Sequence, residues 1–147
     1  MQILVAIDFS DATDRLLEQI ETFAICLQAK VWVIHVAEPD PDFVGYEVDP
    51  ISMRDMVAKR YHKEHQAIQA IASTLRETGI ETQGLLIQGA TIETLLKEAQ
   101  KLGATLIMMG SHGHGATYQL VMGSVSQGVV KGAHCPVMLV PIRQHTM

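Results

Sequence analysis

The residues with the clearest chemical potential are glycines and a serine that follow an apolar run ending at Met109. They are spaced Gly110-x2-Gly113-x9-Gly123-Ser124. Glycines let successive backbone amides approach a phosphate with no Cβ in the way, and amides in a turn form a concave anion site. A helix is expected to begin at Gly123-Ser124, where unpaired N–H groups, the positive dipole end and a hydroxyl can hold a phosphate oxygen. The spacing therefore predicts a phosphate-binding loop.

Two better-known nucleotide motifs do not fit this loop. The stretch Gly110-xxxx-Gly115-Ala116 has the spacing of a P-loop, but alanine stands where the phosphate-binding lysine is required. The dinucleotide fingerprint also fails, because Gly113-x-Gly115 lacks a third glycine and follows the fourth expected strand rather than the first. The sequence thus argues against both classes, and it shows no catalytic triad or base.

The loop needs elements to position it, and the apolar periodicity indicates which they are. Continuous apolar runs alternate with amphipathic stretches in the order βαβαβαβαβ, which predicts an α/β sheet with helices on both faces. Asp11 and Thr91 are expected to cap two of the helices. The strands are expected over residues 3–7, 31–36, 85–87, 104–109 and 136–140, and the helices over about 12–28, 51–77, 91–102 and 124–131.

Asp8 is a second candidate ligand residue because of its place at the end of the first expected strand. In sheets of this kind, ligands bind outside the carboxyl ends of the strands, at the point where the strand order reverses. Asp8 stands at such an end, in the stretch IDFSDAT. A ligand role is therefore favoured over a purely local one, in which its carboxylate caps nearby amides.

Composition indicates a globular chain, and the charge limits the classes of partner that it can bind. The 147 residues, 48% hydrophobic and 18% charged, suffice for one compact domain over 1–147. The net charge of −5 argues against a broad electrostatic contact with nucleic acid or an anionic membrane. The acidity is concentrated in residues 1–50, and no carboxylate side chain follows Glu98. A small anion would meet no fixed side-chain negative charge in the last third.

The cysteines and the first residues bear on location. Cys26 and Cys135 lie in apolar stretches without a CxxC pair or a secreted disulfide spacing, so buried free thiols in a reducing cytoplasm are expected. The start MQILVAID has no basic region, and no stretch approaches the roughly 18 apolar residues of a membrane span. We therefore expect a cytoplasmic protein without a targeting segment or a membrane anchor.

The histidines suggest a metal site that their spacing does not favour. His112 and His114 form an HxH pair and His134 adjoins Cys135, but no third and fourth ligands follow at a fixed spacing. We therefore predict no metal site. His35, in the second expected strand, is interpreted as a hydrogen-bonded structural residue rather than a catalyst.

Taken together, the glycine spacing after an apolar strand resembles the nucleotide-binding signature of the universal stress protein family. VAIDFSDAT at positions 5–13 resembles that family's first strand and loop, His35-Val36 its second-strand end, and HCPVMLVP its closing strand. The resemblance covers essentially the whole chain. It implies a five-stranded parallel sheet of Rossmann-like winding in a single domain, commonly dimeric through the last strand.

The resemblance also implies an ATP site, with Mg²⁺ as an accompanying ion. One group of residues would lie beside adenine and ribose or cover the base: Ala6, Ile7, Asp8, Val36 and Met109. A second group would hold the phosphates: Gly110, Gly113, Gly123, Ser124 and Val125. Asp8 would assist a divalent cation through water, since a carboxylate near phosphates is otherwise repulsive.

The leading hypothesis is an ATP-binding stress-response or signalling module in which the nucleotide is a bound regulator rather than a rapidly consumed substrate. One alternative is a slow ATPase or phosphotransferase that uses His112 or His114. Another is a nucleotide-free interaction protein that acts through its dimer surface. The apolar closing stretch PVMLVPI favours a homodimer, because it would leave an exposed edge at the sheet margin.

Overall fold

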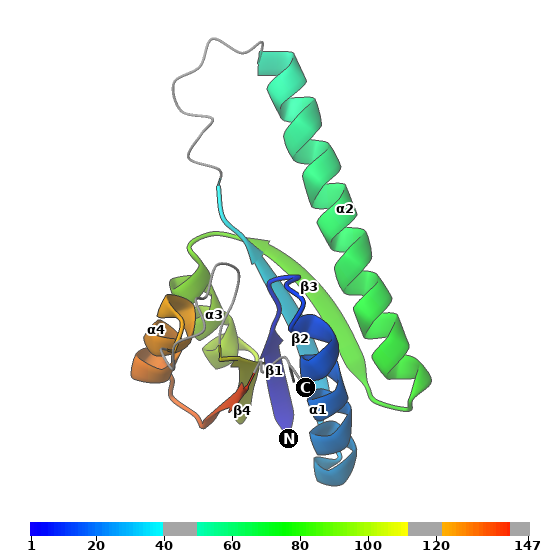
Figure 1. Ribbon diagram of the computed structural model, residues 1–147, viewed down its shortest axis with the longest axis vertical. Coiled ribbons are helices and arrows are strands. Elements are labelled where there is room, and N and C mark those ends of the chain that lie inside the picture. The colour runs from blue at the N-terminus through cyan, green and yellow to red at the C-terminus, as the bar shows by residue number, and fades with distance from the viewer. Residues whose placement is uncertain (40–49, 112–121, 142–147) are drawn as a thin grey trace, which may run out of the picture.

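The computed structural model describes residues 1–39, 50–111 and 122–141, over which strands and helices alternate (Figure 1). The strands are β1 Gln2–Ala6, β2 Lys30–Ala37, β3 Thr82–Gln88, β4 Leu106–Gly110 and β5 Val137–Val140. The helices are α1 Thr13–Leu27, α2 Pro50–Glu77, α3 Thr91–Lys101 and α4 Ser124–Gly132.

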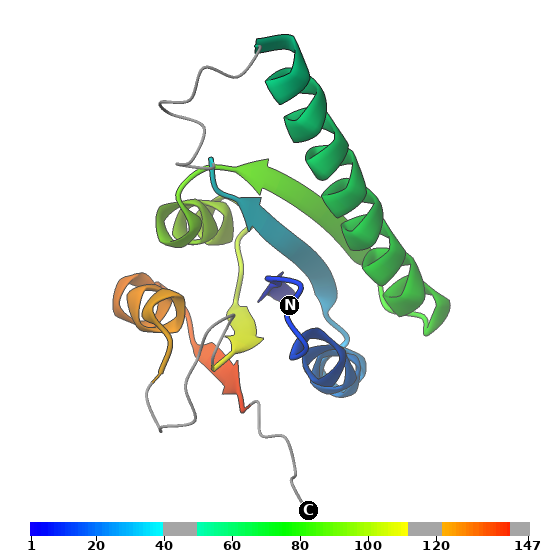
Figure 2. The ribbon, with the colours of Figure 1, turned by 45° about the horizontal axis from the view of Figure 1, so that its top comes forward.

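The five strands form one parallel sheet in the order β3-β2-β1-β4-β5. Ile3 in the central strand β1 lies beside Val31 of β2 and Leu106 of β4. Helices α1 and α2 cover one face of the sheet, and α3 and α4 cover the other (Figure 2). The chain therefore winds outward from β1 in both directions. The predicted α/β fold, with a parallel sheet between two layers of helices, is confirmed.

Each face of the sheet has its own apolar core, because successive side chains of a strand point to opposite faces. Ile3 and Val5 of β1 pack on the side of α1 and α2, and Leu4 packs on the side of α3 and α4. All three side chains are fully buried. A strand covered on both faces has no solvent side, which explains why β1 forms a continuous apolar run in the sequence.

The third strand is longer than the sequence indicated. β3 pairs with β2 from Thr82, opposite Val31, to Gln88, opposite Ala37, whereas the prediction covered only residues 85–87. The early part of β3 is not apolar, and Gly84 has a packing reason to lack a side chain. A Cβ there would lie 2.6 Å from Cγ2 of Ile68 in α2, so the glycine lets the helix approach the sheet closely.

Both predicted helix caps are wrong. The N-cap of α1 is Ala12 rather than Asp11, and the N-cap of α3 is Ala90 rather than Thr91; neither N-cap makes a side-chain hydrogen bond. Thr91 is instead the first residue of α3, and its hydroxyl bonds to Glu38 at the end of β2. The first turn of α3 is therefore held by a side chain from another element.

The expected burial of the cysteines is wrong for Cys26. Both thiols are free, but Cys26 is exposed and Cys135 is half-buried. Helix α1 buries a single stripe formed by Leu16, Ile20 and Ala24. Cys26 follows the last of these by two positions and so falls outside the buried stripe.

Candidate functional site

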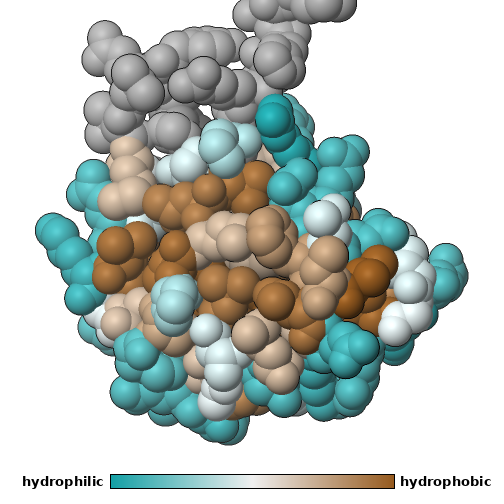
Figure 3. All heavy atoms as spheres, turned by 90° about the horizontal axis from the view of Figure 1, so that it is seen from below, coloured by the Kyte–Doolittle hydropathy of each residue, from teal (hydrophilic) through white to brown (hydrophobic). Residues whose placement is uncertain are grey.

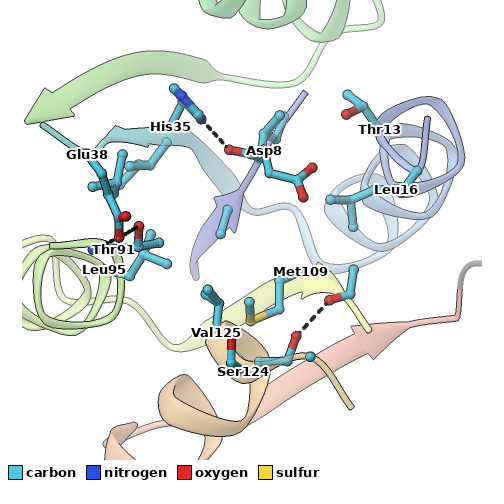
Figure 4. A pocket seen from close by; sticks show the side chains of 18 residues that line it. Asp8, Thr13, Leu16, His35, Glu38, Thr91, Leu95, Met109, Ser124 and Val125 are labelled. Atoms are coloured by element: carbon cyan, nitrogen blue, oxygen red, sulfur yellow. Dashed lines mark hydrogen bonds between the residues drawn. The ribbon is translucent and has the colours of Figure 1, made fainter. Parts of the chain in front are cut away.

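A pocket of about 610 Å³ opens at the carboxyl edge of the sheet (Figure 4). It is lined by the ends of β1, β2 and β4 and by the first turns of α1, α3 and α4. The connection after β1 leads to a helix on one face of the sheet, whereas the connection after β4 leads to a helix on the other. Neighbouring strands whose connections leave in opposite directions open a crevice between them, and this geometry explains the position of the pocket.

The pocket brings together nine of the ten predicted site residues. These are Ala6, Ile7, Asp8, Val36, Met109, Gly110, Gly123, Ser124 and Val125. The tenth, Gly113, lies outside the described residues, as do His112 and His114 of the predicted ATPase alternative. The nine residues share one cavity, and their role in nucleotide binding stays a prediction.

The backbone of Val36 faces the pocket because β2 extends beyond β1 at this edge. The N–H of Ile7, the residue after β1, donates to the carbonyl of Ile34 at 2.9 Å, so the backbone of Ile34 points toward the β1 side. Backbone groups of a strand point to alternate sides from one residue to the next. The N–H and C=O of Val36 therefore point to the same side as those of Ile34, past the end of β1.

The first turn of α4 is fixed against the end of β4. Gly123 is the N-cap, in extended conformation, and its N–H donates to the carbonyl of Ser111 at 3.0 Å. The buried hydroxyl of Ser126 donates to the carbonyl of Gly110 at 3.0 Å. Gly123 has no side chain to cap the first-turn N–H groups of α4, and Ser124 is exposed beside them. The arrangement can accept an anion at the positive end of the helix.

A tight turn carries the chain from β1 into α1. Oδ1 of Asp8 accepts a hydrogen bond from the N–H of Ser10 at 2.9 Å, and the carbonyl of Ser10 accepts one from Thr13 at 3.0 Å. Phe9, between Asp8 and Ser10, has a backbone φ of 58°, a conformation that non-glycine residues adopt rarely. The carboxylate of Asp8 therefore shapes the turn and lines the pocket as well, so the local and the ligand roles are compatible.

His35 is a hydrogen-bonded residue, as predicted, and it also lines the pocket. Its Nδ1 lies 2.7 Å from the carbonyl oxygen of Ile7. The ring of Phe9 lies against the imidazole, with the two centroids 4.5 Å apart. The turn after β1 is thus supported by a side chain from β2.

A contact between Glu38 and Thr91 closes the pocket on the side of α3, and sequence reasoning missed it. Oε1 of Glu38 accepts hydrogen bonds from Oγ1 of Thr91 at 2.6 Å and from its backbone N–H at 3.2 Å. The hydroxyl bond, followed by the backbone bond, lowers the pKa of the Glu38 carboxyl. Glu38 follows the carboxyl end of β2, and Thr91 follows that of β3; this shared edge of the sheet is the signal that could have paired them.

The charge of the pocket lining is negative. Asp8 and Glu38 line it, whereas no lysine or arginine does so among the residues that the structure describes. An anion would therefore be held by backbone N–H groups, hydroxyls and the dipole of α4 rather than by a basic side chain. This differs from a P-loop, where lysine supplies the positive charge.

The described residues contain neither a cluster of metal-ligating side chains nor a membrane-spanning helix. No group of three or more histidine, cysteine, aspartate or glutamate side chains within residues 1–39, 50–111 and 122–141 could hold a metal ion. Over the same residues, no helix is both long and apolar enough to cross a membrane.

The fold and the pocket define a doubly wound α/β protein with a cavity at its switch point. The chain belongs to the universal stress protein family, whose family model matches residues 1–141. It is 37% identical over 139 residues to the "Universal stress protein in QAH/OAS sulfhydrylase 3'region" of Thermus aquaticus. That match covers 94% of this chain and 96% of the relative. The family predicted from the sequence motifs is therefore confirmed.

Solved structures share the fold. The structure of hypothetical protein MJ0577, from Methanocaldococcus jannaschii, matches with a TM-score of 0.85 and 24% identity, covering 99% of this chain and 97% of that one. The universal stress protein from Archaeoglobus fulgidus in complex with dAMP matches with a TM-score of 0.64 and 22% identity, covering 97% and 98%. At these identities the likeness supports the fold alone.

Proposed function

We propose that this chain binds an adenine nucleotide, with ATP as the ligand, and acts as a nucleotide-regulated stress-response or signalling module. The observation that carries the proposal is one cavity that combines apolar side chains with the uncapped first turn of a helix. A nucleotide has the same two-part character, since a planar apolar base is joined to an anionic tail. The volume of about 610 Å³ lies in the usual range for small-ligand sites.

The apolar part of the cavity suits the faces of a base. In Figure 4, the side chains of Leu95, Met109 and Val125 point into the cavity from α3, β4 and α4. The base would also need hydrogen-bond partners at its edge. The backbone N–H and C=O of Val36 extend past the end of β1 and supply one donor and one acceptor.

The first turn of α4 suits the phosphates. Gly110 and Gly123 allow close approach of the backbone, and Ser124 adds a hydroxyl at the positive end of the helix. Asp8 lines the same cavity and carries a charge of the same sign as the phosphates. A divalent cation such as Mg²⁺ between them would turn this repulsion into attraction, so we propose Mg²⁺ as part of the bound ligand.

Family membership supports the proposal at the level of the nucleotide class. A universal stress protein of the same fold was solved in complex with dAMP, an adenine nucleotide. The choice of ATP and of a regulatory role for this chain is our inference from its own cavity.

Nucleotide binding is tested with freshly purified protein. The protein is denatured and its released small molecules are analysed, and ATP with Mg²⁺ is then titrated against protein free of nucleotide. An adenine nucleotide in the extract or saturable binding supports the proposal, and the absence of both overturns it.

A variant at Ser124 separates binding from folding. Ser124→Glu puts a carboxylate in the first turn of α4, which favours the helix but repels a phosphate. We expect ATP affinity to fall about tenfold or more, while thermal stability stays equal or rises slightly. Val130→Glu is the matched control, because Val130 is 44% exposed on the same helix and does not line the cavity. Equal loss of affinity in both variants would contradict the assigned phosphate position.

We further propose a homodimer that forms through β5. This strand is at the margin of the described sheet, where it pairs with β4 on one side. Its residues Val137, Met138 and Leu139 are only half-buried, and an apolar strand edge favours pairing with another chain.

Apolar side chains gather in the middle of the face seen from below in Figure 3, with hydrophilic ones around them. Exposed apolar patches of this kind are typical of interaction surfaces.

A further inference from the structure

Helix α2 reaches the rim of the pocket through two polar contacts. Nη2 of Arg60 donates a hydrogen bond to the carbonyl of Glu38 at 3.4 Å, and Oε2 of Glu64 lies 3.9 Å from Nε2 of His35. The helix packs mainly on β3 and β2 (Figure 1), and none of its described residues lines the cavity. These contacts therefore join an element outside the pocket to residues within it.

The geometry at Ile7 fixes one proton of His35. A carbonyl oxygen can only accept a hydrogen bond, so the Nδ1 atom that lies 2.7 Å from the Ile7 oxygen carries the hydrogen. In a neutral imidazole the other nitrogen, Nε2, is then an acceptor without a hydrogen. Neutral His35 consequently places an acceptor nitrogen 3.9 Å from an oxygen of the Glu64 carboxylate.

A second proton on His35 would give the carboxylate of Glu64 a hydrogen-bond donor. Its Oε2 atom is buried and has no hydrogen-bond partner within the part of the chain that the structure describes. The side chains of His35 and Glu64 are only 14% and 22% exposed, which limits access of water to the contact. A buried acceptor without a donor costs free energy, and an imidazolium N–H at Nε2 would supply the donor.

We propose that His35 is a positioning residue that, when protonated, links α2 to the nucleotide pocket by donating from Nδ1 to the carbonyl of Ile7 and from Nε2 to the carboxylate of Glu64. The inference rests on the proposed nucleotide-binding function and names a regulator of that site, the proton. Loss of the proton leaves the bond to Ile7 in place and breaks the attraction to Glu64. The link therefore depends on whether His35 carries this second proton, and so on pH.

The link acts on the pocket through the turn that carries Asp8. Ile7, which precedes Asp8, is held by the hydrogen bond from His35. Phe9, which follows Asp8, has a left-handed backbone conformation, and its ring packs against the imidazole. The position of the imidazole therefore determines the position of the turn. An anchored imidazole pre-organises the residues that face the base and ribose, and pre-organisation increases affinity by reducing the cost of ordering.

Other charges near His35 have defined effects on the link. On α2, the Nε atom of Arg60 lies 3.9 Å from Oε1 of Glu64, so its positive charge competes with the imidazolium for the same carboxylate. Asp8 and Glu38, which follow β1 and β2, add two carboxylates to the lining of the same pocket. A bound nucleotide adds negative charge beside His35, so binding and protonation reinforce each other.

The first test uses the protein without nucleotide. Imidazole ¹⁵N NMR between pH 5.5 and 8.5 is expected to find the neutral form of His35 protonated at Nδ1. The midpoint of its titration is expected to be lower in Glu64→Gln than in the wild type, because the facing charge is lost. Glu77→Gln, at an exposed position of the same helix, is the matched control and leaves the midpoint unchanged. Equal midpoints in the two variants, or a neutral form protonated at Nε2, would overturn the proposal.

The second test measures the dissociation constant of ATP with Mg²⁺ at pH 6 and pH 8. The amide of Glu64→Gln can accept from a protonated Nε2 and donate to an unprotonated one, so this variant keeps the link at both values. The wild type is expected to lose about threefold more affinity than Glu64→Gln between pH 6 and 8, and comparing the proteins cancels the ligand's own protonation. His35→Asn, which cannot titrate, is expected to lack the wild-type pH dependence. An equal change in wild type and Glu64→Gln overturns this inference alone, whereas no ATP binding by any variant overturns the proposed function with it.

Discussion

The carboxylate of Glu38 holds the first turn of α3 through Thr91, a residue 53 positions further along the chain. Its Oε1 atom accepts from the Oγ1 of Thr91 at 2.6 Å and from the backbone N–H at 3.2 Å. The helix thus receives at its N-terminus the acceptor that its own N-cap residue, Ala90, does not provide. The end of β2 and the start of α3 are joined at the edge of the pocket.

Replacing Glu38 with glutamine is expected to reduce stability by about 0.5 kcal/mol near neutral pH, a small effect because the carboxylate is exposed. The hydrogen bonds from Thr91 lower the pKa of Glu38 below the ordinary value of a glutamate, 4.5. Its extra stabilisation is therefore complete above about pH 4.5 and is lost as the pH falls through the lowered value. Thermal unfolding of both proteins from pH 3 to 7 measures the difference, which should vanish at the acid end.

The control for Glu38 is Glu93→Gln. Glu93 is an exposed acidic residue in the first turn of the same helix, so its replacement removes the same charge without the bonds to Thr91. It tests whether helix-dipole electrostatics alone explain the effect. If the two variants lose stability equally at every pH, the contact with Thr91 contributes nothing of its own.

Helices α3 and α4 are packed through a glycine. A Cβ at Gly128 of α4 would overlap the Cδ1 atom of Ile92 in α3. Gly128→Ala is expected to destabilise the protein by about 1 kcal/mol, because overpacking exceeds the gain in helix propensity. Ile92→Val removes Cδ1 but keeps Cγ1 and Cγ2, which lie 3.0 and 3.1 Å from the added Cβ, so Gly128→Ala should cost less in that background than in the wild type. Chemical unfolding of the four proteins gives the double-mutant cycle, and additive effects would contradict the close contact.

The two thiols are expected to react at different rates. Cys26 is exposed on α1, whereas burial of Cys135 raises the pKa of its thiol above the ordinary value of a cysteine. A higher pKa lowers the thiolate fraction near neutral pH and thus the rate of alkylation. Labelling with a maleimide at pH 7.5 should show a fast and a slow phase. Cys26→Ser should remove the fast phase and Cys135→Ser the slow one; the reverse assignment would show that access does not follow the described burial.

The proposed dimer predicts that a charge on β5 separates the protomers. Met138→Lys places a cation on the half-buried margin strand, where it disfavours edge-to-edge pairing. Sedimentation at micromolar concentration should show a dimer for the wild type and a monomer for the variant, with circular dichroism confirming that the variant stays folded. Val130→Lys adds the same charge at an exposed position of α4 and should remain dimeric. A monomeric wild type would reject the dimer.

The strands and the pocket position could be predicted because they depend on local patterns. Leu4 and Ile107 lie in runs that are buried on both faces, so apolar continuity alone located β1 and β4. The alternation of strands and helices then indicated which loops share the carboxyl edge. β3 was underestimated because Gly84 serves packing against Ile68 and interrupts the apolar pattern that marks a strand.

The polar contacts around the pocket could not be predicted in this way. Glu38 joins Thr91, and Glu64 approaches His35, across elements that are distant in the chain. Such pairs depend on the distance between a helix and a sheet and on side-chain rotamers, neither of which leaves a periodic signal. Apolar periodicity predicts which face of α2 is buried, but it does not indicate which of its polar residues meets the pocket.

Asp8 offers a test of whether the cavity binds ATP together with Mg²⁺. In the wild type, the N–H of Ser10 lies 2.9 Å from Oδ1 of Asp8. Asp8→Asn keeps a side-chain oxygen that can accept this hydrogen bond, so the turn and the fold are expected to persist. Without Mg²⁺ the variant should bind ATP more tightly than the wild type, because one repulsive charge is gone. With Mg²⁺ the order should reverse, by about fivefold, since the carboxylate no longer attracts the cation.

Calorimetric titration with and without Mg²⁺ measures both effects of Asp8→Asn in the same proteins. Asp11→Asn, at an exposed position within the same connection, is the matched control and should follow the wild type in both conditions. An aspartate that only shapes the turn predicts no change in either condition, because asparagine preserves the acceptor. Reversal of the affinity order on adding Mg²⁺ therefore distinguishes a carboxylate that faces the phosphates from one whose contribution ends at the backbone of Ser10.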